Sequence, residues 1–269
     1  MSSGIRLFHS LKTLMSYRRR LLEGVLLDVR QQYTGSVLGI FWAVLFPLLQ
    51  LSIFAALYTV VFKVRPVGLT SWDYVLLVFS GLVPLLAFTA MLTSATGSLT
   101  ANKNLLLNTV FPAEMIPLRS ALAAHVPGVS GLIITLLLGY ALGRTSWQAL
   151  VVVPLVWLLL VMFSVGLCWM LSLLSLIAKD IQHVLGIILM LMMILSPYAY
   201  TPEMVPSTLR FIIYLNPMSY FVLACQQVIA YGVWPDPIPA LGSIALGLGG
   251  FLLGYSVFLK AKFLLFDYA

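Results

Sequence analysis

The stretch Leu150-VVVPLVWLLLVMFSVGLCWMLSLLSLI-Ala178 contains no charged residue and is longer than the ~20 residues that a helix needs to cross a bilayer. Five further apolar stretches of similar character fill most of the 269-residue chain. They run over Val37–Phe62, Tyr74–Gly97, Leu118–Leu142, Val184–Tyr200 and Ile238–Leu259. The sequence therefore predicts an all-α integral membrane protein with six transmembrane helices.

The composition agrees with this fold class. Hydrophobic residues make up 61% of the chain, charged residues 9%, and the mean hydropathy is +1.05, whereas a soluble domain carries about a quarter charged residues. The segments outside the stretches are too short to form a separate catalytic or nucleotide-binding domain. We expect two parts: an amphipathic cytoplasmic helix within residues 1–36, and one permease domain over residues 37–269.

The net charge of +7 is better explained by membrane orientation than by nucleic-acid binding. If both termini are cytoplasmic, eleven of the 15 Lys and Arg residues lie inside and four outside, as the positive-inside rule predicts. The inside set is Arg6, Lys12, Arg18, Arg19, Arg20, Arg30, Lys103, Arg119, Lys179, Lys260 and Lys262, and the outside set is Lys63, Arg65, Arg144 and Arg210. We expect a multi-pass protein of the cytoplasmic (inner) membrane, its first span an uncleaved signal, with no nucleic-acid partner.

Residues 6–31 have the apolar spacing of an amphipathic helix, which would lie along the cytoplasmic membrane surface. This helix either anchors in the headgroups alone or also packs against a cytoplasmic partner. In the first span, Trp42, Phe46, Gln50, Phe54, Tyr58 and Phe62 follow one another at four-residue steps, so their side chains stack along the helix. The row either faces a substrate or faces lipid and another helix. Gln50 is its best pointer to a path, since an amide in hydrocarbon needs a partner or water.

Two segments outside the spans are unusually apolar. Residues 101–117 mix amides, Lys103 and Glu114 with an apolar centre that suggests a surface made to be covered. Residues 201–237 predict two short helices broken at Asn216-Pro217, which would dip into the outer leaflet as a gate or as a passive cap. In the last span, Gly250 and Gly254 form a GxxxG pair that permits close helix packing.

The sequence contains few residues that could act in catalysis. The spans hold essentially no acidic residues, and the nearest approach to a phosphate-binding loop, Gly97 to Lys103, lacks the second glycine and the hydroxyl after the lysine. Cys168 and Cys225 give neither a disulfide framework nor metal-ligand spacing. We expect no metal and no cofactor in this chain, and an energy source outside it.

Several motifs together resemble the ABC-2-type permeases that export polysaccharides and polyol phosphates, among them O-antigen, capsule and teichoic acid exporters. The opening Asp28-VRQQYTGSVLGIF-Trp42 followed by Pro47-Leu-Leu is one such motif. The others are Asn104-LLLNTVFPAEMI-Pro117, the turn Lys179-Asp180, and Ser196-Pro197 leading to Asn216-Pro217. The resemblance covers the whole chain in order.

The resemblance implies an ABC-2 (type V) exporter fold, working as a homodimer on two separate ATPase subunits that bind ATP and Mg²⁺. It implies a coupling helix at 101–116, an interface helix at 6–31, and outer gate helices at 201–218. The residues implied for ATPase coupling are Asn104, Leu105, Leu106, Leu107, Phe111, Glu114, Lys179 and Asp180. Those implied for the interface helix are Arg19, Arg20, Asp28 and Arg30, and for the gate Pro202, Glu203, Pro206, Asn216 and Pro217. Trp42, Gln50, Tyr58, Phe62, Tyr198 and Tyr200 form the expected channel path.

The function expected from these observations is export of a lipid-linked polysaccharide, with membrane lipids as further partners. Two alternatives remain. An exporter of lipids or small hydrophobic compounds would have a lipid-accessible cavity, and a membrane enzyme acting on lipid-linked sugars would turn over its substrate without an ATPase.

Overall fold

The computed structural model describes residues 16–61, 70–102 and 112–262, and within these ranges the chain is helical with no strand. The helices at the start of the chain are α2 (Arg18–Tyr33), η1 (Gly39–Phe41), α3 (Trp42–Ala56), the π-helical turn η2 (Leu57–Val61), α4 (Ser71–Thr96) and α5 (Ser98–Ala101). The later ones are α7 (Met115–Ala124), α8 (Val126–Ala141), α9 (Ala149–Ile177), α10 (Ile181–Leu195), η3 (Pro202–Met204), η4 (Ser207–Leu209), α11 (Arg210–Leu215), α12 (Met218–Ile229) and α13 (Pro237–Ala261).

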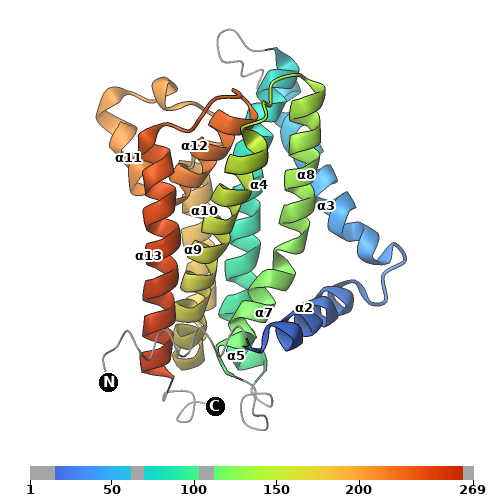
Figure 1. Ribbon diagram of the computed structural model, residues 1–269, viewed down its shortest axis with the longest axis vertical. Helices are drawn as coiled ribbons and strands as arrows, with labels where there is room; N and C mark the ends of the chain where they lie inside the picture. Colours follow the sequence, from blue (N-terminus) through green and yellow to red (C-terminus); the bar gives the residue numbers. More distant parts are fainter. Residues whose placement is uncertain (1–15, 62–69, 103–111, 263–269) are drawn as a thin grey trace.

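The long helices stand side by side, and α2 lies across one end of the bundle (Figure 1). We call this the α2 end; α5, the start of α7 and the last turn of α13 lie there as well. Five helical segments are long and apolar enough to cross a membrane, and the bent pair Ser207–Leu215 and Met218–Ile229 makes a sixth if it is counted as one span. The predicted all-helical membrane fold is confirmed.

One predicted span differs in length. The sequence predicted a fifth span over Val184–Tyr200, whereas α10 covers only Ile181–Leu195 and is about 22 Å long. The helix ends because Ser196 adopts an extended backbone before Pro197, as the residue before a proline commonly does. A helix of this length falls short of the ~30 Å hydrocarbon core. The bent pair that follows it, α11 and α12, lies towards the end opposite α2 (Figure 1).

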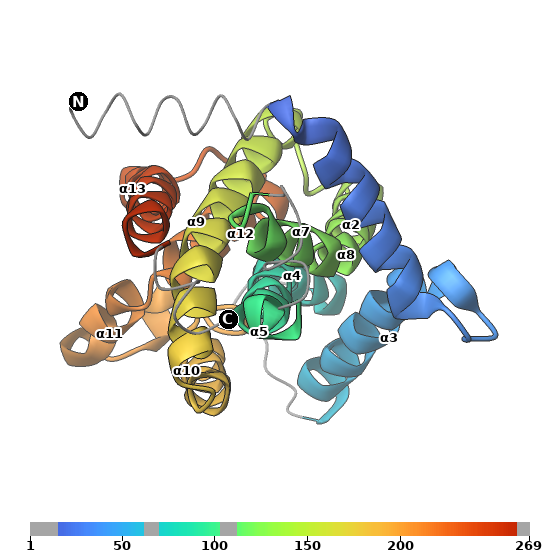
Figure 2. The same ribbon diagram turned by 90° about the horizontal axis from the view of Figure 1, so that it is seen from below.

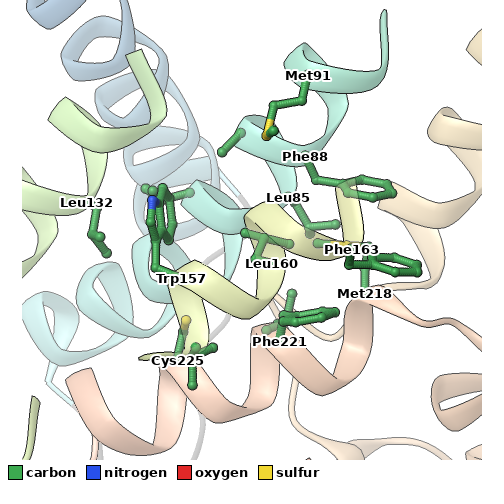
Figure 3. Close-up of a cluster of buried hydrophobic side chains, with 14 of the residues drawn as sticks. Leu85, Phe88, Met91, Leu132, Trp157, Leu160, Phe163, Met218, Phe221 and Cys225 are labelled. Atoms are coloured by element: carbon green, nitrogen blue, oxygen red, sulfur yellow. The ribbon is translucent and has the colours of Figure 1, made fainter. Parts of the chain in front are cut away.

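The core gathers around α4, the most buried of the spans, while α3 is the least buried. Phe88 of α4, Phe163 of α9 and Phe221 of α12 form a stack whose ring centroids are 5.7 and 5.8 Å apart (Figure 3). Trp157 and Leu160 extend this cluster along α9 (Figure 3). Helix α12, the second helix of the bent pair, is therefore part of the core rather than a surface cap.

The most extensive helix pair is α9 with α13. Its close approach depends on glycines, because a Cβ built on Gly254 would lie 2.1 Å from the carbonyl oxygen of Gly166. One turn away on α13, the carbonyl oxygen of Gly250 would lie 2.1 Å from a Cβ built on Gly166. The predicted GxxxG pair thus packs against a third glycine in the fourth span.

At the end opposite α2, side-chain bonds fix the start of α4 and join it to the turn between α8 and α9. Thr70 and Asp73 form a capping box at the start of α4. Asp73 also receives two hydrogen bonds from Arg144, at 2.7 Å from Nε and 2.6 Å from Nη2. The hydrogen bonds from Arg144 to Asp73 raise the pKa of Arg144 above its usual value, so Arg144 stays charged. The charged pair joins the turn between α8 and α9 to the start of α4.

Candidate functional site

A cavity of about 1000 Å³ lies between α2, α3, α4, α7 and α8, and is partly open to the outside. Polar side chains line the part next to α2, and apolar ones line the part further along α3 and α4. The polar lining includes Asp28, Gln31, Gln32, Thr93, Ser94, Asn102 and Arg119; the deeper lining includes Phe46, Pro47, Leu51, Val83, Ala87 and Gly131. The volume is at the upper end for small-molecule sites in proteins, and the lining is amphipathic along its length.

An ion pair lies in the polar part of the cavity. Arg119 of α7 donates from Nε to Oδ2 of Asp28 in α2 at 2.7 Å, and the two side chains are 19% and 18% exposed. Gly24 makes this contact possible, since a Cβ at that position would lie 2.5 Å from Cδ of Arg119. Tyr33 lines the same cavity, and burial raises the pKa of its hydroxyl, which therefore stays neutral. Asp28, predicted for the interface helix, therefore connects α2 to α7 through its ion pair with Arg119.

The other predicted interface-helix residues point to solvent or to the membrane surface. Arg19 is exposed and pairs with Glu23 at 3.0 Å, Arg20 lies 5.3 Å from the ring centroid of Tyr17, and Arg30 is exposed in the last turn of α2. The described part of the predicted helix, Arg18–Tyr33, is confirmed; residues 6–15 lie outside the described residues.

The aromatic row of the first span is divided between two surroundings. Trp42, Phe46 and Gln50 line the cavity, whereas the Phe54 ring packs edge-on against Tyr198 at a centroid distance of 6.5 Å. Phe62 and the side chain of Tyr58 lie outside the described part of the chain. The structure therefore joins Trp42 and Gln50 in one cavity and places Tyr198 elsewhere.

Tyr198 and Tyr200 lie in the irregular segment after α10. Tyr198 is buried next to Gln226 of α12, which donates from Nε2 to the carbonyl oxygens of Pro197 and Tyr198 at 3.0 and 3.2 Å. The Tyr200 hydroxyl donates to the carbonyl oxygen of Leu195 at 2.7 Å. Gln226 was not singled out by the sequence analysis, because a glutamine in an apolar helix does not show which carbonyls it will meet.

The predicted gate segment has the expected break. The helices on either side of Asn216-Pro217 are bent by 102°, and Asn216 holds the corner. Its Nδ2 donates to Met192 O at 2.9 Å and Ser196 Oγ at 2.8 Å, while its Oδ1 accepts from Met218 N at 3.0 Å. Pro202 begins η3, Pro206 is exposed before η4, and the Glu203 side chain lies outside the described residues.

Replacing Asn216 with leucine should lower the unfolding temperature of the purified protein. The buried Met218 amide would lose its acceptor, at a cost of about 1–3 kcal/mol, and the carbonyl oxygen of Met192 and the hydroxyl of Ser196 would each lose one donor. A thermal melt followed by tryptophan fluorescence measures the change, and Ser207→Ala, an exposed change in the same segment, should leave the temperature unaltered. Equal melting of both variants would show that Asn216 does not hold the corner.

The residues predicted for ATPase coupling lie in three places. Lys179 and Asp180 are exposed in the turn between α9 and α10, at the α2 end. Asn104, Leu105, Leu106, Leu107 and Phe111 lie outside the described residues. Glu114 is buried: its carboxylate pairs with Lys262 of α13 at 3.2 Å, and its backbone carbonyl accepts from Nε1 of Trp169 in α9 at 2.8 Å.

Lys262 as a partner for Glu114 was missed by the sequence analysis, as was Arg119 as a partner for Asp28. The two members of these pairs are separated by 148 and 91 residues, so no local pattern joins them. Glu114 is therefore a buried residue that connects the end of the predicted coupling segment to α9 through its backbone carbonyl and to the end of α13 through its carboxylate.

The fold is a multi-pass helical membrane bundle with a surface helix across one end, a bent helix pair and an amphipathic cavity. Residues 26–229 match the family described as ABC-2 type transporter, and the chain belongs to this family. It is similar to the O-antigen export system permease protein RfbA of Klebsiella pneumoniae, with 29% identity over 242 residues that cover 88% of this chain and 89% of that protein. The protein of the same name from Myxococcus xanthus is 26% identical over 241 residues, covering 88% and 91%.

Proposed function

We propose that this chain is the membrane subunit of an ATP-driven exporter that moves a lipid-linked polysaccharide across the cytoplasmic membrane. The observation that carries the proposal is the match over nearly the full length to O-antigen export permeases, within a family of transporter subunits. In this proposal, two copies of the chain assemble with two ATPase subunits, which bind ATP and Mg²⁺.

The proposed orientation places the α2 end in the cytoplasm. Among the described residues, Arg18, Arg19, Arg20, Arg30, Arg119, Lys179, Lys260 and Lys262 lie at that end, and Arg144 and Arg210 lie at the other. This asymmetry supports cytoplasmic α2 and α13 ends by the positive-inside rule. It would also put Lys179, Asp180 and the segment around residues 101–116 on the side where an ATPase works.

The second copy is proposed to face α3 and α10. These helices flank the same side of the molecule (Figure 2), and their outer residues are exposed and apolar, among them Ile53 and Ile187. A channel between two copies would then be lined from the first span and from the segment after α10, where Trp42, Gln50, Tyr58, Phe62, Tyr198 and Tyr200 were predicted. Aromatic rings suit a sliding glycan because each contact is weak and needs no fixed register.

Force transmission is proposed to pass from residues 101–116 through Glu114. Its carbonyl is bonded to α9 and its carboxylate to α13, and these two helices pack on each other through Gly166 and Gly254. Movement of the coupling segment would therefore displace the α9–α13 pair as one body. Lys179-Asp180, at the end of α9, provides the proposed second contact with the ATPase.

Deleting Leu105–Leu107 should abolish ATP-dependent export while the ATPase subunits continue to hydrolyse ATP. The deletion removes an apolar surface proposed to dock in the ATPase, and it leaves Glu114 in place. Proteoliposomes holding both subunits and a lipid-linked glycan would measure transport and phosphate release together. Normal export by the deleted chain, or uphill transport by this chain without ATPase subunits, would refute the proposal.

One observation favours the alternative of an exporter of lipids or small hydrophobic compounds, namely the amphipathic cavity beside α2. ATP-driven movement of a fluorescent phospholipid in the same proteoliposomes, undiminished by the glycan, would support that alternative. Competition by the glycan would support the polysaccharide substrate.

A further inference from the structure

The polar part of the cavity holds a guanidinium group with unused donors. Arg119 engages Asp28 through Nε alone, and within the described residues its terminal nitrogens Nη1 and Nη2 have no hydrogen-bond partner. The Arg119 side chain is 19% exposed and lines the cavity. A planar fork of free N–H groups is suited to a phosphate, which it binds through two parallel hydrogen bonds.

The second charge in this place is the carboxylate of Asp28. Only its Oδ2 is bonded to Arg119, and Oδ1 remains as an acceptor for a cation. One guanidinium and one carboxylate leave the cavity's polar part without net charge. It therefore matches a head that carries both a phosphate and an ammonium group better than a head with several negative charges.

The deeper part of the cavity suits a hydrocarbon chain. Phe46, Pro47, Leu51 and Val83 line it, and Gly131 leaves room where a side chain would narrow it. Phe46 is 56% exposed, so the cavity is accessible from the flank of α3, which the fold places against the bilayer or a second copy. An occupant arriving from that side is an amphiphile rather than a water-soluble compound.

We propose that this cavity holds one resident glycerophospholipid of the phosphatidylethanolamine type. Its phosphate binds the terminal nitrogens of Arg119, its ammonium group binds Asp28, and one acyl chain lies along α3 and α4. The lipid joins α2 to α3, α4 and α7, and so stabilises the crossing helix in its place. In this inference the lipid is a structural component and not the transported cargo, so it competes with the lipid-export alternative for the same cavity but does not depend on which glycan the protein exports.

The test uses the full chain in nanodiscs that contain equal fractions of phosphatidylethanolamine, phosphatidylglycerol and polyprenyl phosphate. After release into detergent, native mass spectrometry counts the lipids that stay bound. We expect one phosphatidylethanolamine per chain. Arg119→Gln should reduce its retention about tenfold or more, the effect of losing charge-assisted hydrogen bonds to phosphate. Asp28→Asn should remove the preference for phosphatidylethanolamine over phosphatidylglycerol.

Because both substitutions also break the ion pair with α2, a third variant leaves the pair intact. Ala90→Phe puts a ring into the cavity from α4 and should abolish retention, while Ala245→Phe, at an exposed position on α13, should retain the lipid. Unchanged retention in Ala90→Phe would overturn the site. Preferred retention of phosphatidylglycerol or polyprenyl phosphate by the unaltered chain would overturn the assigned occupant.

Discussion

Gly254→Leu is expected to prevent the chain from folding to a monodisperse protein, and Gly254→Ala to lower its unfolding temperature. The nearest atoms to a Cβ at this position are the backbone O, C and Cα of Gly166, at 2.1 to 2.5 Å. A backbone cannot rotate away as a side chain can, so α9 and α13 would have to separate along their whole contact. Overpacking commonly costs about 1–3 kcal/mol, and we expect the leucine variant to exceed this range.

Gly249 supplies the matched control on the same helix. A Cβ there has no neighbour within 4 Å, and alanine is favoured over glycine inside a helix by about 1 kcal/mol. Gly249→Ala should therefore leave the unfolding temperature unchanged or raise it, opposite in sign to Gly254→Ala. Size-exclusion profiles and thermal melts in one detergent measure both. Two variants that behave alike would mean that glycine at 254 is not required for packing.

The extent to which the sequence predicts this structure depends on how local the determining interactions are. Five of the six predicted spans and the break at Asn216-Pro217 agree with the structure, because hydropathy and proline geometry act within a few residues. The GxxxG pair was found in the sequence, but its partner Gly166 was not, since a lone glycine in a helix does not indicate which helix will approach it. The fifth span was predicted too long because the apolar run continues past the point where Pro197 ends the helix.

The site shows the same limit more clearly. The resemblance assigned Asp28 to the interface helix and Glu114 to ATPase coupling, yet their partners Arg119 and Lys262 come from segments distant in the sequence. Trp42 and Gln50 were predicted for a path, and α2 was predicted as a surface helix, but no sequence pattern showed that the two together would enclose a cavity with α4, α7 and α8. Of the predicted channel residues, Trp42 and Gln50 share one cavity whereas Tyr198 lies elsewhere, a distinction that required the fold.

The pair Glu114–Lys262 leads to the second large effect. Glu114→Lys should destabilise the protein strongly, because an ammonium group would be buried beside Lys262 where the carboxylate was 5% exposed. Breaking a buried ion pair in this way costs about 3–5 kcal/mol. Lys262→Glu should cost less than Glu114→Lys, since the side chain at 262 is 42% exposed and can turn into water; its cost is that of leaving the buried Glu114 carboxylate without its cation. The unfolding temperature of each variant measures the asymmetry.

The exchanged pair, Glu114→Lys with Lys262→Glu, separates stability from force transmission. Restored attraction should recover part of the unfolding temperature lost in Glu114→Lys, as a double-mutant cycle would quantify. If Glu114 transmits movement from the coupling segment, the exchanged pair should also recover ATP-dependent export with the ATPase subunits present. Recovery of stability without export would show that the pair is structural only. No recovery of stability would mean that the charges at 114 and 262 do not interact, and the proposed connection from residues 101–116 to α13 would be wrong.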